Sequence, residues 1–224
     1  MTASAQSVLA ELKALGKESF RKTYRRHGAG DDVYGVSTAD LKALQKKIKV
    51  DQTIAAGLWA SGNYDARILA AMVADPEKAE RATLDAWVRD LDNYPITAAF
   101  AGLAAATPHA RWLAETWMKS KQEYVSSTGW QIVAHLAMKD RSLDDAYFAE
   151  RLEIIRRDIA KAPNRTRHNM NGALIAIGSR NAALEAKALA VARAIGKVEV
   201  DHGETGCTTP DAARYIAKIK ARKK

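Results

Sequence analysis

Residues 97–106 read TAAFAGLAAA, and two further stretches share this small-residue character: ARILAAMVAD at 66–75 and GALIAIGSRN at 172–181. Apolar residues return every three or four positions in each stretch, which predicts amphipathic helices. Alanine and glycine at the contact positions allow neighbouring helices to approach closely, since side-chain size sets the distance between helix axes. The three stretches therefore predict a scaffold of tightly packed helices.

The same periodicity extends along most of the chain. It predicts helices at 4–15, 17–27, 37–48, 51–61, 63–74, 77–90, 94–106, 109–119, 121–138, 143–160, 165–178, 181–196 and 210–221. Short helices joined by a few residues favour antiparallel pairs, and such pairs often stack as an α-solenoid. We expect an all-α protein, a single HEAT-like domain over residues 1–224, with a concave face. The alternative is an irregular helical bundle.

Several predicted helices have recognisable ends. Asp51 and Asn63 precede apolar helical periods, and Asn93 or its neighbour Asp92 is expected to cap a helix that has Pro95 in its first turn. Gly196 is a plausible residue to end a helix. Thr209 is expected to cap the last helix, with the following proline in the first turn.

Composition points to a soluble protein with a polyanionic partner. The formal charge is +9, the apolar fraction is 47%, and the chain has one cysteine. A single cysteine excludes an internal disulfide and fits a reducing compartment, and no apolar run approaches the roughly 18 residues of a membrane span. We expect a cytoplasmic protein with no membrane partner. The positive charge favours nucleic acid, although a basic surface that only maintains solubility is the alternative.

Four stretches carry a resemblance to a known family: YGVSTADLKALQKKIK (34–49), LWASGNYDARILAAMVAD (58–75), LDAWVRDLDNYPITAAFAGL (84–103) and EYVSSTGWQIVAHLAMKD (123–140). In this order they make the chain similar to the AlkD-like DNA alkylation repair family of HEAT-like proteins. The closing stretch from Met170 to Ile219 resembles one branch of it. The resemblance implies DNA binding, and in the active members a glycosylase that removes alkylated, positively charged purines with aromatic rings, one acid and one arginine.

The family's site residues match this chain incompletely. Tyr94 falls where the family has a tryptophan, Ala98 where it has the acid, Ser127 where it has the arginine, and Ala173 near a later tryptophan. Asp92 lies close to this segment, and we keep it with Tyr94 as a catalytic candidate. The resemblance thus predicts that DNA binding is retained and that base excision is doubtful.

A second group of candidates lies near the C-terminus. Asp201, His202, Glu204 and Cys207 offer carboxylate, imidazole and thiol groups within seven residues, after the alternating stretch that begins at Lys197. Such groups suit acid–base chemistry or a borderline metal such as zinc; the alternative is a turn made by the nearby glycines, whose side chains satisfy the backbone of the loop. We take Asp201, His202 and Glu204 as catalytic candidates and expect no metal or other cofactor.

Basic and amide side chains cluster between the predicted last helices. Arginine and lysine bind phosphates, and asparagine donates to them. Our DNA-binding candidates are Arg165, Arg167, Asn169, Asn171, Arg180, Lys197 and Lys218. The alternative assigns the asparagines to capping and contacts between helices, with the arginines in solvent.

Three functions remain open: an AlkD-like glycosylase, a DNA-binding relative without that chemistry, and a HEAT-like scaffold that binds protein. The absent acid and arginine favour the second over the first, and the charge of +9 disfavours the third. We therefore expect a monomer that binds double-stranded DNA in a basic concave groove.

Overall fold

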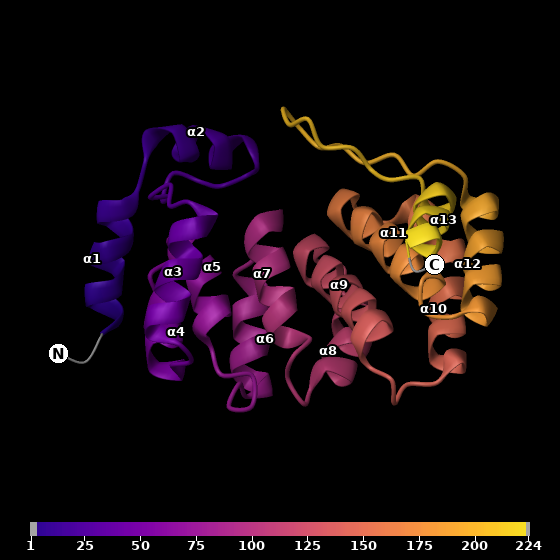
Figure 1. The fold of residues 1–224 in the computed structure, drawn as a ribbon, viewed down its shortest axis with the longest axis horizontal. Coiled ribbons are helices and arrows are strands. Elements are labelled where there is room, and N and C mark those ends of the chain that lie inside the picture. Colours follow the sequence, from indigo (N-terminus) through magenta and orange to yellow (C-terminus); the bar gives the residue numbers. More distant parts are fainter. Residues whose placement is uncertain (1–3, 223–224) are drawn as a thin grey trace. The chain divides into compact units, whose positions relative to one another are not determined.

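The computed structural model describes residues 4–222, and over that range it contains helices and no strand (Figure 1). The α-helices are α1 (Ala5–Leu15), α2 (Glu18–Arg26), α3 (Thr38–Ile48), α4 (Gln52–Ala60), α5 (Tyr64–Val73), α6 (Arg81–Arg89), α7 (Tyr94–Ala104), α8 (Ala110–Trp117), α9 (Glu123–Lys139), α10 (Asp145–Asp158), α11 (Asn164–Gly178), α12 (Ala182–Ile195) and α13 (Ala212–Arg222). A 3₁₀ turn, η1 (Ile159–Lys161), follows α10. The prediction of an all-α protein is confirmed.

Most predicted helix boundaries are confirmed, with one wrong cap. Asp51, Asn63 and Asn93 each accept a backbone N–H of the first turn, and Gly196 ends α12 with a φ of 67°. The last helix differs: Asp211, not Thr209, accepts the N–H of Arg214, at 2.8 Å. The predicted cap was wrong because a carboxylate three residues before a free N–H competes successfully with the earlier hydroxyl.

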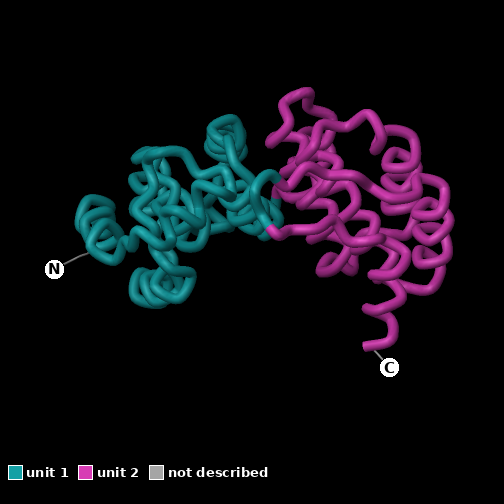
Figure 2. Tube along the Cα trace, turned by 90° about the horizontal axis from the view of Figure 1, so that it is seen from above, with its two compact units in different colours: residues 1–108, 203–205 teal, residues 109–202, 206–224 magenta. Residues whose placement is uncertain are grey.

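Contacts divide the chain into two compact units (Figure 2). Unit 1 comprises residues 1–108 with residues 203–205, and unit 2 comprises residues 109–202 with residues 206–224. The single domain over residues 1–224 stays a prediction. Among the described helices, none has both the length and the apolar character that crossing a bilayer would need.

Unit 1 is built around α4, α5 and α7, whose apolar faces pack against one another. Trp59 and Trp87 stack in parallel with ring centroids 4.5 Å apart, and Phe100 packs against both rings. Asp90 accepts the indole N–H of Trp59 at 2.9 Å, so the polar edge of this buried ring is satisfied. Large rings thus fill the space that the alanines of α5 and α7 leave between the helices.

One buried carboxylate fixes the loop between α2 and α3. Asp65, in the first turn of α5, is fully buried and accepts the backbone N–H groups of Tyr34, Gly35 and Val36 at 2.7, 3.0 and 2.9 Å. Burial raises the pKa of Asp65, whereas the three donated bonds lower it. Asp65 therefore holds the loop that leads into α3 against the start of α5.

Unit 2 is built around the pair α9 and α11, with α8 packed on α9 and α12 packed on both α10 and α11. The contact between α8 and α9 depends on Gly129. A Cβ atom at this position would lie 2.3 Å from the backbone nitrogen of Met118 and 2.8 Å from its Cα. Only glycine allows the end of α8 to lie this close to α9.

We predict that Gly129→Ala destabilises the protein by roughly 2 kcal/mol, because the added methyl group must displace the backbone of α8. Gly102→Ala is the matched control, since a Cβ atom there meets nothing within 4 Å, and it should stabilise α7 by about 0.5–1 kcal/mol. Urea unfolding of both variants measures the difference. Equal stabilities would contradict the assigned role of Gly129.

Candidate nucleic-acid interface

Tyr94 lies in a pocket of about 410 Å³ in unit 1. The pocket is formed by side chains of α2, α3, α5 and α7, and it is lined by the aromatic rings of Tyr24, Tyr64, Tyr94 and His27. His27 Nδ1 and the hydroxyl of Tyr94 form a hydrogen bond, and the two rings meet edge to face. Burial raises the pKa of Tyr64 and of Tyr24, and in both cases the nearby charge of Asp65 adds to the effect. The pocket therefore offers aromatic faces and neutral hydroxyl groups.

No Asp or Glu side chain belongs to the lining of this pocket. Ala98, one turn after Tyr94, is exposed, and the neighbouring Asp92 is also exposed and accepts the side-chain amide of Asn93 at 2.7 Å. Asp65 is nearby, but its oxygens are occupied by three backbone donors. The pocket consequently lacks a free carboxylate that could stabilise a developing positive charge.

Ser127 is part of a polar seam between α9 and α11. Its hydroxyl oxygen lies 2.5 Å from Asn169 Nδ2, its carbonyl accepts from the same amide at 3.2 Å, and its hydroxyl donates to the carbonyl of Arg165 at 3.3 Å. Beside this contact, the hydroxyls of Ser126, the preceding residue of α9, and Thr166 of α11 lie 2.5 Å apart. Ser127 is 1% exposed, so the position where the family resemblance placed an arginine is here a buried helix contact. Ala173, at the later position, is also buried.

Four of the predicted DNA-binding side chains bond within unit 2. Asn169 joins the seam, and Asn171 is 1% exposed and donates to the carbonyl of Pro210 at 2.9 Å. Arg180 donates to the carbonyls of Ala137 and Leu143, and its guanidinium stacks 4.6 Å from the Phe148 ring. Arg167 donates to the carbonyls of Ala162 and Glu199, both at 3.0 Å. These side chains orient the backbone around them.

The segment 197–211, which we call the arm, joins α12 to α13 and contains no helix or strand (Figure 1). Three residues of α11 form hydrogen bonds with the arm. Asn164 exchanges two hydrogen bonds with the backbone of Asp201, at 2.7 and 2.8 Å, while Arg167 and Asn171 bind the carbonyls of Glu199 and Pro210. These three residues are spaced by three and four positions, so they share one face of α11. The arm is therefore fixed at its base along one helix.

His202 is the arm residue that turns towards α11. Its ring meets the ring of His168 edge to face at 5.5 Å, and its Nε2 lies 2.9 Å from the hydroxyl of Thr209. Burial lowers the pKa of His168, and the positive charges of His202 and Arg165 lower it further. Burial also lowers the pKa of His202, again with Arg165 contributing. Two neutral imidazoles beside an arginine result.

The other residues of the predicted 201–207 cluster do not converge on His202. Asp201, Glu204 and Cys207 are exposed. Within residues 4–222, no group of three His, Cys, Asp or Glu side chains has a geometry that would hold a metal ion. The cluster is thus dispersed along the arm, with one half-buried histidine in contact with His168 of α11.

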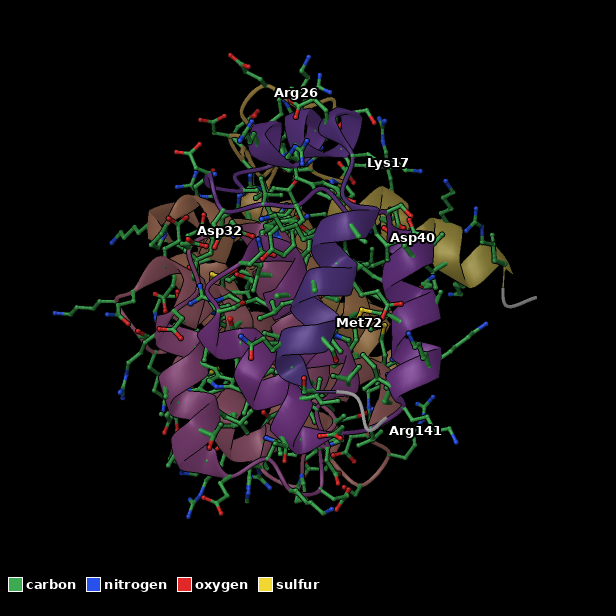
Figure 3. The ribbon with its side chains drawn as sticks, turned by 90° about the vertical axis from the view of Figure 1, so that its left-hand side faces the viewer. Lys17, Arg26, Asp32, Asp40, Met72 and Arg141 are labelled. Carbon is green, nitrogen blue, oxygen red and sulfur yellow. The ribbon has the colours of Figure 1, made fainter. Side chains whose placement is uncertain are left out.

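Exposed basic side chains remain on several elements. Lys218 of α13 is exposed, and Lys197 is exposed and paired with Glu199 at 2.7 Å. In unit 1, Arg26 ends α2 and is exposed; it is labelled in Figure 3. Lysines and arginines with solvated heads are the groups that contact phosphates at little structural cost. The last two residues of the basic tail, Lys223 and Lys224, lie outside the described residues.

Sequence reading missed Asn164 altogether, and it missed that His168 would meet His202. Both lie on the helix that carries the predicted arginines, and position 164 precedes 167 and 171 by one and two turns. That spacing signals a shared face, but it gives no indication that the face packs against a segment more than 30 residues later. The pairing depends on tertiary contact alone.

A family model, two known sequences and a solved structure are each similar to this chain over most of its length. A family model described as "DNA alkylation repair enzyme" matches residues 8–216. An uncharacterized protein of Listeria monocytogenes (strain EGD-e) is 31% identical over 221 residues, covering 96% of each chain, and one from Listeria innocua is 31% identical over 219 residues, covering 95% of each. A solved structure matches with a TM-score of 0.91 and 31% identity, over 99% of this chain and 95% of its own; it is described as "a new family of proteins related to the HEAT-like repeat DNA glycosylases with affinity for branched DNA structures".

We predict that acid destabilises unit 2 through His168. Because its folded pKa is lowered, the unfolded chain binds the proton more readily, so stability is fully present above about pH 6.5, the ordinary histidine value, and falls as the pH drops through and below it. His168→Gln should flatten this dependence. Thermal unfolding between pH 5 and pH 8 measures it, with His109→Gln, at a half-buried histidine before α8, as control. Parallel pH profiles for wild type and His168→Gln would contradict the assignment.

Proposed function

The chain belongs to the DNA alkylation repair enzyme family, and from that premise we propose that it is a DNA-binding protein that recognises branched and duplex DNA. The observation that carries the proposal is the match to a solved relative over 99% of this chain, with a TM-score of 0.91. That relative is described as having affinity for branched DNA structures. A fold shared at this level, with 31% identity, supports a shared class of ligand.

The electrostatic character of the chain supports the same ligand. A formal charge of +9 attracts a polyanion and favours release of condensed counterions from DNA. We assign direct phosphate contacts to Arg165, Lys197 and Lys218, whose side chains lie at or near the surface. Arg167 and Asn171 then act by positioning the arm, and Asn169 and Arg180 act by fixing α9 beside α11.

Base excision by the family's route is not part of the proposed function. The Tyr94 pocket has aromatic faces, but no carboxylate lines it. The family's arginine position is Ser127, whose hydroxyl is held by Asn169 in the seam. An excision site needs a group that stabilises the developing sugar cation, and these substitutions remove two of the family's functional groups at once. Asp92, Asp201, His202 and Glu204 stay predictions as catalytic residues.

We predict salt-dependent binding to a four-way junction and to the matched duplex, with the junction bound more tightly. Lys218→Ala and Arg165→Ala should each weaken binding to both DNAs a few-fold and reduce the magnitude of the slope of log K against log salt by about one. Fluorescence anisotropy at several salt concentrations measures both effects. Lys187→Ala, an exposed lysine of α12 outside the proposed set, is the control.

The absence of binding to either DNA at low salt would overturn the proposal and leave the helical repeat as a protein scaffold. Equal losses in Lys187→Ala and Lys218→Ala would keep DNA binding but reject the assigned contacts.

We predict that the protein does not release N7-methylguanine from a labelled duplex, because the pocket has aromatic rings without a catalytic carboxylate. Single-turnover assays with excess protein measure release of the base. Release that Tyr94→Phe, Asp92→Asn or His202→Ala abolishes, while binding is unchanged, would show that excision survives with a different set of residues.

A further inference from the structure

A second pocket, in unit 2, is not explained by DNA binding. It has a volume of about 560 Å³ and lies between α9, α11 and α13. Its walls are made largely of small residues: Ala134 and Ala137 on α9, and Gly172 and Ala176 on α11. A Cβ atom built at Gly172 would meet nothing within 4 Å. The hollow therefore exists because short side chains face each other across it.

Specific contacts hold α13 in place beside this hollow. Ile216 is 1% exposed and fits against Gly178, where a Cβ atom would lie 2.6 Å from the Ile216 Cδ1. Just before α13, the carbonyl of Pro210 accepts the amide of the buried Asn171 at 2.9 Å. The helix is thus fixed through one face, and its adjacent side chains, Tyr215 and Ile219, line the pocket. The pocket is consequently part of the packed fold.

Exposed apolar side chains gather at this pocket. Four large apolar side chains of the described residues are exposed, namely Val50, Trp112, Met138 and Tyr215. Two of them, Met138 at 53% and Tyr215 at 43%, belong to this pocket. Exposed apolar groups that gather at one concave site mark binding surfaces, and the volume falls in the range of small-molecule sites, about 300–1,000 Å³. The ligand must therefore have a sizeable apolar body.

The charge of the lining is entirely positive. Its charged members are Arg141 and Arg180. Arg180 is held by the carbonyls of Ala137 and Leu143 and by the Phe148 ring, so its guanidinium is preorganised. Arg141 is exposed, and the structure gives it no hydrogen-bond or ion-pair partner among residues 4–222. A fixed and a free guanidinium at one apolar hollow favour an anionic group on the ligand.

We propose that this pocket binds a small amphipathic anion, a molecule with an apolar or aromatic body and one anionic head group. The body lies between α9, α11 and α13 against Ile175 and Tyr215, and the head group bonds to Arg141 beside Arg180. A free carboxylate and a phosphate ester share this chemistry. The site contains none of the three proposed phosphate contacts, Arg165, Lys197 and Lys218, although Arg180 belongs to both arguments.

The test uses the full chain and the fluorescent probe 8-anilinonaphthalene-1-sulfonate, which has an aromatic body and one negative charge. We expect saturable binding of one probe per chain, with displacement by dodecanoate or dodecyl phosphate and none by dodecyltrimethylammonium. The more effective of the two displacers identifies the head group. Gly172→Phe should abolish binding because its ring fills the open hollow, whereas Gly172→Ala should bind normally.

Arg141→Gln should weaken probe binding about tenfold, the effect of losing one charge-assisted hydrogen bond. Arg193→Gln, an exposed arginine of α12 outside the pocket, should leave it unchanged. Thermal unfolding of each variant verifies that the fold is intact, and Ala134→Met fills the same hollow from α9 if Gly172→Phe does not fold. Unsaturable binding of the probe, or wild-type binding by both filling variants, would overturn the proposal. Equal competition by the cationic amphiphile would also overturn it. So would displacement of the probe by a short single-stranded oligonucleotide but not by dodecanoate.

Discussion

Most of the described helices are too short to be stable alone, and the packing of the chain answers that constraint. They span 8 to 17 residues, and isolated helices shorter than about 12–15 residues are marginal in water. Each must bury its apolar face on a neighbour, as in other stacked helical repeats. Close approach is therefore the central requirement, and Gly129, where α8 touches α9, meets it directly. The abundance of alanine on α5, α7 and α11 serves the same requirement more diffusely.

Polar groups do a different task, which is to fix where the helices and loops lie. Asp65 gathers three backbone donors of one loop, Ser127 and Asn169 lock α9 to α11, and Arg180 caps the carbonyl end of α9. A buried polar group without a partner is costly, so such networks select one arrangement over nearby alternatives. Ser127 is an example of such a network. Where the resemblance placed a catalytic arginine, this chain has a serine whose hydrogen bonds join α9 to α11. The side chain at that position is therefore used for helix packing.

The fold was largely predictable from the sequence, and the site only in part. Helical periodicity and local caps such as Asn63 and Asn93 depend on neighbours within a few residues, so the boundaries could be read directly. The bonds of Arg167 and Asn171 join positions more than 30 residues apart, and no local pattern distinguishes an arginine that binds a carbonyl from one that binds phosphate. The Thr209 cap was wrong because Asp211, two residues later, competes for the same helix start. The pocket beside Gly172 was unforeseen because hollows arise from what side chains leave unfilled.

The arm has a further consequence. Three residues of α11 form hydrogen bonds with main-chain atoms of the arm. Asn164 binds the amide and carbonyl of Asp201. Arg167 binds the carbonyl of Glu199, and Asn171 binds the carbonyl of Pro210. Since any amino acid except proline at 201 supplies the same atoms, side chains along the arm are free to diverge without loosening its attachment. Substitution of the exposed side chains of Glu199 and Asp201 therefore leaves these main-chain attachments in place.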